Sequence, residues 1–176
     1  YSMIYNILKP LVSISLRAYF KRIDVKGKEH LDYKHLLLVS NHPSAMFDPL
    51  LIAVASKKQL HFIAGIEWFG KGLKKWLFTK HFNMIPVYRP WLKTGKNQDN
   101  KDMFRECYMS LERGDTIIIY PEAESITVPW IRELKTGAAR IKLGADQHLK
   151  DGGIDEEVKI VPVGLNYSNP HRFQSG

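Results

Sequence analysis

Residues 36–50 have the sequence LLLVSNHPSAMFDPL, and this stretch decides the fold class. Its apolar run predicts a buried strand over residues 36–40, and residues 47–55 have the pattern of the helix that follows. His42 lies in the turn between them, where Pro43 disfavours a helical backbone at the histidine. Asp48 falls in the first turns of the helix. A buried strand that leads through such a turn into a helix is the repeating unit of an α/β sheet.

His42 and Asp48 form a candidate catalytic pair. A carboxylate beside one imidazole nitrogen fixes the tautomer and stabilises the protonated ring, which leaves the other nitrogen to take a proton from an alcohol. Taken alone, such a pair is more often a helix cap and a solvent-exposed acid. The motifs further along the chain favour the catalytic interpretation.

The rest of the chain alternates between predicted strands and predicted helices. This alternation indicates a mostly parallel sheet flanked by helices, an α/β fold. Because parallel strands bring their carboxyl ends to one edge, the polar groups that follow four of the strands should meet there. These groups are Asn41-His42, Tyr88-Arg89, Glu122 and Asn166-Tyr167. The remaining strands are expected at residues 60–64, 83–88, 116–120 and 159–165, and the remaining helices at residues 68–80, 102–113 and 135–149.

The N-terminal segment has a different character. Residues 3–22 are mostly apolar, carry four basic side chains and are interrupted by Pro10. A basic amphipathic helix of this kind is typical of segments that lie in the membrane interface and meet anionic lipid, although a helix packed on the core is the alternative. We therefore expect an interfacial helical segment over residues 1–28 and a catalytic domain over residues 29–176, as a piece of a longer protein.

The composition of the chain limits the classes of molecule that it is expected to bind. The 176 residues suffice for one domain with a sizeable core, and 26 lysines and arginines against 18 aspartates and glutamates give a net charge of +8, which favours anionic partners. The positive charge follows no nucleic-acid-reading motif, so nucleic acid is not expected. No apolar run is long enough for a membrane span, and the histidines lack metal-ligand spacing. The single cysteine, Cys107, is predicted to be a small core residue.

Three later motifs carry further candidate residues. The sequence IPVYRP over residues 85–90 presents Arg89 at a strand end, where a guanidinium suits phosphate or carboxylate. The sequence YPEAES over residues 120–125 places Glu122 at the edge of the sheet, where it could accept hydrogen bonds from a polyol. In IVPVGL, residues 160–165, the proline indicates an edge strand or a break in the ladder.

In this order, NHPSAMFD, IPVYR, YPEAES followed by LKTGAAR, and VPVG resemble the four blocks of the glycerolipid acyltransferase family. That family includes glycerol-3-phosphate, 1-acylglycerol-3-phosphate and other lysophospholipid acyltransferases. The resemblance implies that His42 and Asp48 are the catalytic dyad. It also implies a substrate-binding set, made up of Arg89, Glu122, Ser125, Lys135 and Pro162.

The same resemblance implies the partners. The acyl donor would be a thioester on coenzyme A or acyl carrier protein, acting as co-substrate with no cofactor and no metal. The acceptor would be a phosphorylated glycerol or a lysophospholipid, and the enzyme would lie peripherally on the cytoplasmic face of a membrane. A thioester hydrolase that uses the same dyad, or a non-catalytic basic lipid-binding module, stays open as an alternative.

The chain departs from the family pattern in two places. Five residues separate His42 from Asp48, where four are commoner. In the third block Ala123 replaces a glycine, which restricts the backbone, and no arginine follows until Arg132. Recognition of a phosphate would then fall to Arg89, with Lys135 or Arg140 as possible substitutes for the missing arginine.

Overall fold

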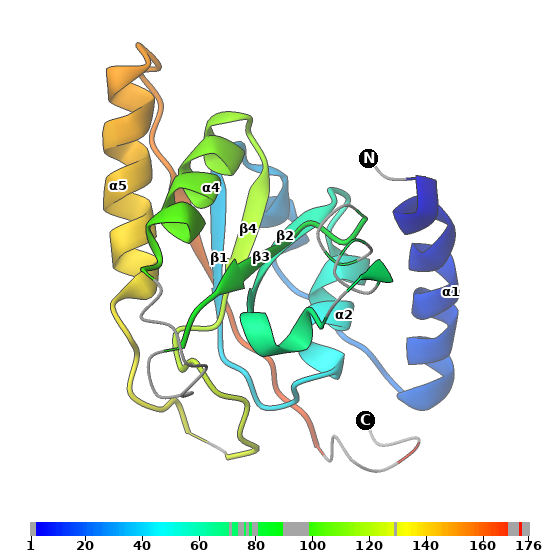
Figure 1. Ribbon diagram of the computed structural model, residues 1–176. Helices are drawn as coiled ribbons and strands as arrows, with labels where there is room; N and C mark the ends of the chain where they lie inside the picture. The colour runs from blue at the N-terminus through cyan, green and yellow to red at the C-terminus, as the bar shows by residue number, and fades with distance from the viewer. Residues whose placement is uncertain are drawn as a thin grey trace.

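Five parallel strands form one sheet in the order β3-β2-β4-β1-β5 (Figure 1). The computed structural model describes residues 3–70, 72–73, 76, 78, 81–89, 99–128, 130–168 and 173. The predicted α/β fold with a parallel sheet is confirmed, and the strand that contains Pro162 lies at one edge, which is one of the two positions that its proline indicated. The strands are β1 (Leu36–Ser40), β2 (Leu60–Gly65), β3 (Met84–Val87), β4 (Thr116–Ile119) and β5 (Lys159–Val163).

The two faces of the sheet bury alternate side chains of the central strands. Leu37 and Ile117 belong to one core cluster, whereas Leu36, Leu38 and Ile118 belong to the other, and all five are fully buried. A strand that is covered on both faces has no solvent-facing side and therefore reads as a continuous apolar run. This is why β1 and β4 were recognisable without any alternation of polar and apolar residues.

Helices cover both faces (Figure 1). The helices α4 (Lys101–Glu112) and α5 (Gly137–Asp151) supply one core cluster, and α2 (Phe47–Ala55) contributes Ile52 to the other. A Cβ at Gly144 of α5 would lie 2.1 Å from the Tyr108 hydroxyl of α4, so glycine permits the close approach of these helices. Cys107 is a buried core residue, as predicted, and burial raises the pKa of its thiol to about 12.

The helix α1 (Met3–Tyr19) packs on α2 and is continuous through Pro10. The expectation that Pro10 interrupts this segment is therefore wrong. The proline removes one backbone hydrogen bond, and burial of Tyr5 and Leu16 against the rest of the domain offsets that loss. Among the described residues, no helix has the length and apolar character needed to cross a membrane.

The other predicted elements agree with the structure to within two residues at each end, with one exception. Part of the helix predicted over residues 68–80 lies outside the described residues, as does most of the polar loop that follows β3. The described part begins with a short 3-10 helix, η2 (Ile66–Trp68), directly after β2. A second 3-10 helix, η1 (Lys28–Asp32), connects α1 to β1.

Candidate active site

A large cleft opens at the edge of the sheet where the strands end. Its volume is about 980 Å³, and its lining includes four of the predicted site residues, namely His42, Arg89, Ser125 and Lys135. Further lining comes from the inner face of α1, from α2, from β2 and from the start of α5. Of the polar groups that were predicted to converge, His42, Tyr88 and Arg89 line this cavity, whereas Asn166 and Tyr167 line a separate one.

His42 and Asp48 lie in direct contact within this region. His42 Nδ1 is 2.7 Å from Asp48 Oδ2, and because a carboxylate only accepts, Nδ1 carries the proton. Asp48 is fully buried, whereas 16% of the His42 side chain is exposed and the residue lines the cleft. This geometry places Nε2 on the side of the ring away from Asp48. The pair therefore has the arrangement of an oriented general base.

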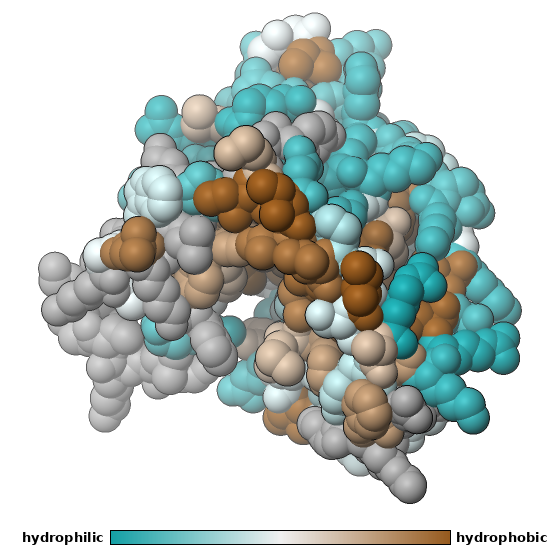
Figure 2. All heavy atoms as spheres, turned by 90° about the vertical axis from the view of Figure 1, so that its right-hand side faces the viewer, coloured by the Kyte–Doolittle hydropathy of each residue, from teal (hydrophilic) through white to brown (hydrophobic). Residues whose placement is uncertain are grey.

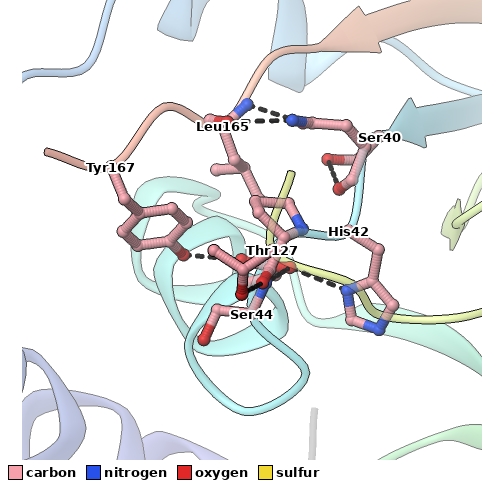
Figure 3. Close-up of polar contacts among 9 residues, drawn as sticks. Ser40, His42, Ser44, Thr127, Leu165 and Tyr167 are labelled. Carbon is pink, nitrogen blue, oxygen red and sulfur yellow. Dashed lines mark hydrogen bonds and ion pairs between the residues drawn. The ribbon is translucent and has the colours of Figure 1, made fainter. Parts of the chain in front are cut away.

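Two further donors hold the Asp48 carboxylate. The backbone N–H of Ser44 donates to Oδ2 at 2.8 Å, and the Tyr167 hydroxyl donates to Oδ1 at 2.6 Å. Figure 3 shows His42 and Tyr167 approaching from two different strand ends, with their dashed bonds converging between them. A buried carboxylate needs such partners, because its charge is otherwise costly to take out of water.

Two tyrosines surround the pair. The Tyr120 ring stacks on the His42 imidazole, with centroids 3.9 Å apart and planes inclined by 15°. Burial, with the Asp48 carboxylate nearby, raises the pKa of Tyr120 well above its ordinary value. Burial and the hydrogen bond to Asp48 likewise raise the pKa of Tyr167. Both phenols are therefore protonated at neutral pH, and Tyr167 acts as a donor.

Hydrogen bonds to backbone groups hold the turn that carries His42. The Asn41 side chain donates to the Leu165 carbonyl at 2.9 Å and accepts from the Leu165 N–H at 2.7 Å, which ties the end of β1 to the end of β5. On the other side, the N–H of Ile126 donates to the His42 carbonyl at 3.2 Å, and the Thr127 hydroxyl donates to the Pro43 carbonyl at 2.8 Å. The two residues that directly follow YPEAES therefore brace the first block.

Arg89 lines the cleft in an ion pair. Its Nη1 lies 3.2 Å from Glu67 Oε1, and about a quarter of the arginine side chain is exposed. A Cβ at Gly65 would come within 2.4 Å of the Glu67 carboxyl atoms, so the glycine makes room for this acid. The Asn100 side chain bonds both backbone groups of Tyr88, which fixes the strand end that carries Arg89.

Two predicted site residues do not reach this cleft. Glu122 follows β4 closely, but it is 5% exposed and does not belong to the cleft lining, in contrast to the expectation that it stands open at the edge. Pro162 lies exposed on the edge strand β5 and lines a separate cavity of about 310 Å³ beside residues 22–27. Substrate binding by these two residues stays a prediction that this geometry does not favour.

The remaining cations differ in how they are held. The Lys135 ammonium lies 3.1 Å from Glu133 and is half exposed, and the Arg140 guanidinium lies 4.3 Å from the centre of the Phe104 ring. Both residues line the cleft. The next arginine in the third block, Arg132, pairs instead with Glu124 at 3.3 Å. In the part of the chain that the structure describes, no three His, Cys, Asp or Glu side chains gather as metal ligands would.

Sequence reasoning missed three contacts. It singled out Tyr167 as a polar group at a strand end, but its bond to Asp48 joins residues 119 positions apart, and no local pattern encodes that contact. The stacking of Tyr120 on His42 and the pairing of Glu67 with Arg89 also depend on the strand order. The glycine two residues before Glu67 was the one local sign of a close approach.

The fold and the site together define an α/β domain with a histidine–aspartate pair at the carboxyl edge of a parallel sheet. The model of the acyltransferase family matches residues 22–166, and the chain belongs to that family. The resemblance that the four blocks indicate is thereby confirmed. No solved structure matches the chain.

Two curated relatives carry acyltransferase names. Glycerol-3-phosphate O-acyltransferase 1 of Saccharomyces cerevisiae is 36% identical over 104 residues, which cover 54% of this chain. An uncharacterized acyltransferase of Schizosaccharomyces pombe is 31% identical over 156 residues, which cover 86% of this chain. The matched segments amount to only 13% and 21% of the lengths of these relatives.

Proposed function

We propose that this domain moves a fatty acyl group from a thioester to a hydroxyl of a glycerol phosphate or a lysophospholipid. The donor is carried on coenzyme A or acyl carrier protein. The observation that carries the proposal is the 2.7 Å contact between His42 and the buried Asp48 at the wall of a large cleft. Membership of the acyltransferase family supports the reaction class, and the name of the yeast relative supports a glycerol phosphate as acceptor.

In this mechanism, His42 Nε2 takes the proton of the acceptor hydroxyl as its oxygen attacks the thioester carbonyl carbon. Asp48 stabilises the imidazolium that results. The tetrahedral intermediate then collapses, the carbon–sulfur bond breaks, and the leaving thiolate takes the proton from Nε2. The products are an ester and a free thiol, and His42 returns to its neutral form. General-base assistance of this kind contributes roughly 10²- to 10⁴-fold to the rate.

The lining of the cleft suits both substrates. Apolar side chains from α1, α2 and β2, such as Leu8, Leu50 and Phe62, offer a surface for an acyl chain, and each buried methylene contributes about 0.8 kcal/mol. Arg89, Lys135 and Arg140 line the same cleft and offer positive charge to a phosphate. The volume of about 980 Å³ lies at the upper end for small-molecule sites, as a lipid substrate requires.

We further propose that the domain binds peripherally to the cytoplasmic face of a membrane that contains anionic lipid. Met3, Ile7, Leu11 and Ile14 are more than half exposed on α1, at intervals of three and four residues that place them on one face. Figure 2, which looks onto the side where α1 lies, shows apolar side chains gathered in the middle of this face beside a hollow. A lipid acceptor would then reach the cleft from the bilayer.

The proposal is tested by incubating the purified chain with acyl-coenzyme A or acyl carrier protein thioesters and a panel of acceptors. Glycerol 3-phosphate, 1-acylglycerol 3-phosphate and lysophosphatidylcholine make up the panel, and both thiol release and acylated product are measured. We expect thiol release that depends on an acceptor and equals the ester formed. Equal thiol release without any acceptor would identify a hydrolase. Vesicle binding without thiol release would identify a lipid-binding module.

A further inference from the structure

We propose that Tyr167 is a positioning residue of the dyad, and that its hydroxyl fixes the Asp48 carboxylate and thereby sets the proton affinity of His42. The inference rests on the proposed function only in taking His42 as the base. Tyr167 lies four residues beyond the last strand, in a part of the chain with no local signal of a catalytic contact.

Three hydrogen-bond donors contact the two oxygens of the Asp48 carboxylate. His42 Nδ1 and the Ser44 N–H both donate to Oδ2, whereas the Tyr167 hydroxyl donates to Oδ1 at 2.6 Å. Bonds at Oδ2 alone would leave Oδ1 without a donor in a carboxylate that is fully buried. The tyrosine bond satisfies this second oxygen and adds a further restraint on the orientation of the carboxylate.

Tyr167 is itself held in place by the strand that carries His42. Asn41, the residue before the histidine, bonds both backbone groups of Leu165, which lies two residues before Tyr167. The Tyr167 ring also lies 5.8 Å from the Phe20 ring, just past the end of α1. Asn41 thus holds the end of β5, the segment after β5 brings Tyr167 to Asp48, and Asp48 in turn holds His42, the residue after Asn41.

The direction of the effect follows from charge. A donor to a carboxylate stabilises its ionised form, so its removal raises the proton affinity of the coupled His42–Asp48 unit. The titratable groups that face this unit include Tyr120 from the end of β4 and Tyr167 from beyond β5, while Phe20, whose ring lies beside that of Tyr167, is uncharged. Because both tyrosines are protonated, they add no charge of their own near neutral pH.

The test compares Tyr167→Phe with a matched control, Tyr33→Phe. Tyr33 is 44% exposed, and its hydroxyl bonds a surface histidine, His30, at 3.2 Å. The pH titration of the His42 imidazole is followed by NMR, with its signals assigned by their loss in His42→Gln, and needs no substrate. Where thioester-dependent transfer is present, kcat and KM for the acceptor are measured across pH as well.

We expect His42 in Tyr167→Phe to become protonated at a higher pH than in the unaltered chain, because the lost bond had stabilised the ionised Asp48 carboxylate. The acid limb of kcat should move to higher pH, with little change in KM. Incorporation of 3-fluorotyrosine at position 167 makes the phenol a stronger donor and should shift the His42 pKa downward. It serves as the second variant if Tyr167→Phe does not fold.

An unchanged His42 titration in both Tyr167 variants, or a shift no larger than in Tyr33→Phe, would overturn the inference. Failure of the proposed function has a different outcome. The chain would then transfer no acyl group with any donor, and the NMR titration would still decide the role of Tyr167.

Discussion

Arg89 and Lys135 both reach the cleft paired with an acid, but the ion pair of Arg89 with Glu67 is the more buried of the two. This ion pair engages one nitrogen of the guanidinium, and among the described residues no other partner is found for the remaining donors of the fork. The pair and the Asn100 contacts with Tyr88 hold the arginine at the end of β3. A preorganised guanidinium loses less entropy when it binds a phosphate.

If the acceptor carries a phosphate, Arg89→Ala should lower kcat/KM for that acceptor by about 10- to 100-fold. A charge-assisted hydrogen bond contributes about 1.5–3 kcal/mol, and each tenfold corresponds to roughly 1.4 kcal/mol. The measurement compares matched phosphorylated and unphosphorylated acceptors. Arg132→Ala is the control, because Arg132 pairs with Glu124 and does not belong to the cleft lining. Equal losses on both acceptors would make Arg89 structural.

Ala123 has a left-handed backbone, with φ at 61°, in the turn that its N–H closes to the Tyr120 carbonyl at 3.0 Å. This is the position where the family pattern carries glycine. A left-handed backbone costs an alanine roughly 1–2 kcal/mol, whereas glycine costs about 0.4–1 kcal/mol through the unfolded chain. Ala123→Gly should therefore raise the free energy of unfolding by about 0.5–1 kcal/mol.

Denaturant unfolding of purified protein checks this prediction. The control is Ala139→Gly, at an exposed position in the first turn of α5, where glycine should lower stability by about 0.5–1 kcal/mol. If Ala123→Gly destabilised the protein as much as the control does, the account of strain in this turn would be wrong.

At the scale of secondary-structure elements, α1 packs on the domain, and the proposed membrane contact falls to its outer face. Its inner face buries Tyr5 and Leu16 and contributes Leu8 and Val12 to the cleft, so the helix does pack on the domain. Lys9 donates to the carbonyl of Ser56 at the end of α2, and burial lowers the pKa of this lysine. The exposed outer face of α1, which includes Ile7 and Leu11, is the surface that the membrane proposal concerns.

Substitution of this outer face separates the two roles more cleanly than deletion of the helix, which would expose the core. We expect Ile7→Gln with Leu11→Gln to weaken sedimentation with anionic liposomes at least tenfold, because each buried side chain is worth about 1.5–3 kcal/mol. Salt should weaken binding of the unaltered chain. Leu143→Gln on α5 is the control, since Leu143 is equally apolar and 69% exposed. Unchanged binding by the double variant would contradict the membrane proposal.

At the scale of the whole molecule, the sequence predicted the elements but not their arrangement. The strands β1 and β4 and the helices were predictable because apolar runs and helical periodicity are local properties. The position of β4 between β1 and β2 depends on pairing across about 80 residues of chain, so no local pattern shows it. The same limit explains why the His42–Asp48 contact was foreseen from a spacing of six residues, whereas the bond from Tyr167 was not.

The burial of Glu122 was missed for a related reason. A residue just past a strand end is exposed or buried according to the loop that covers it. Here Ile126 and Thr127, in the loop after Glu122, bond back to His42 and Pro43. The Lys135 N–H donates to the Pro121 carbonyl at 2.8 Å, which closes that loop over the residues after β4. Sequence reasoning therefore located the site more reliably than it assigned each side chain to the cleft.

The most direct test of the central claim is the turnover of His42→Ala in acyl transfer from a thioester to the preferred acceptor. His148→Ala serves as the control, because His148 also pairs with an acid, Glu112, at 3.0 Å but does not belong to the cleft lining. Circular dichroism first checks that both variants are folded. We then expect His42→Ala to lose at least ~10²-fold in kcat and His148→Ala to lose little. Near-normal turnover by a well-folded His42→Ala variant would contradict the account.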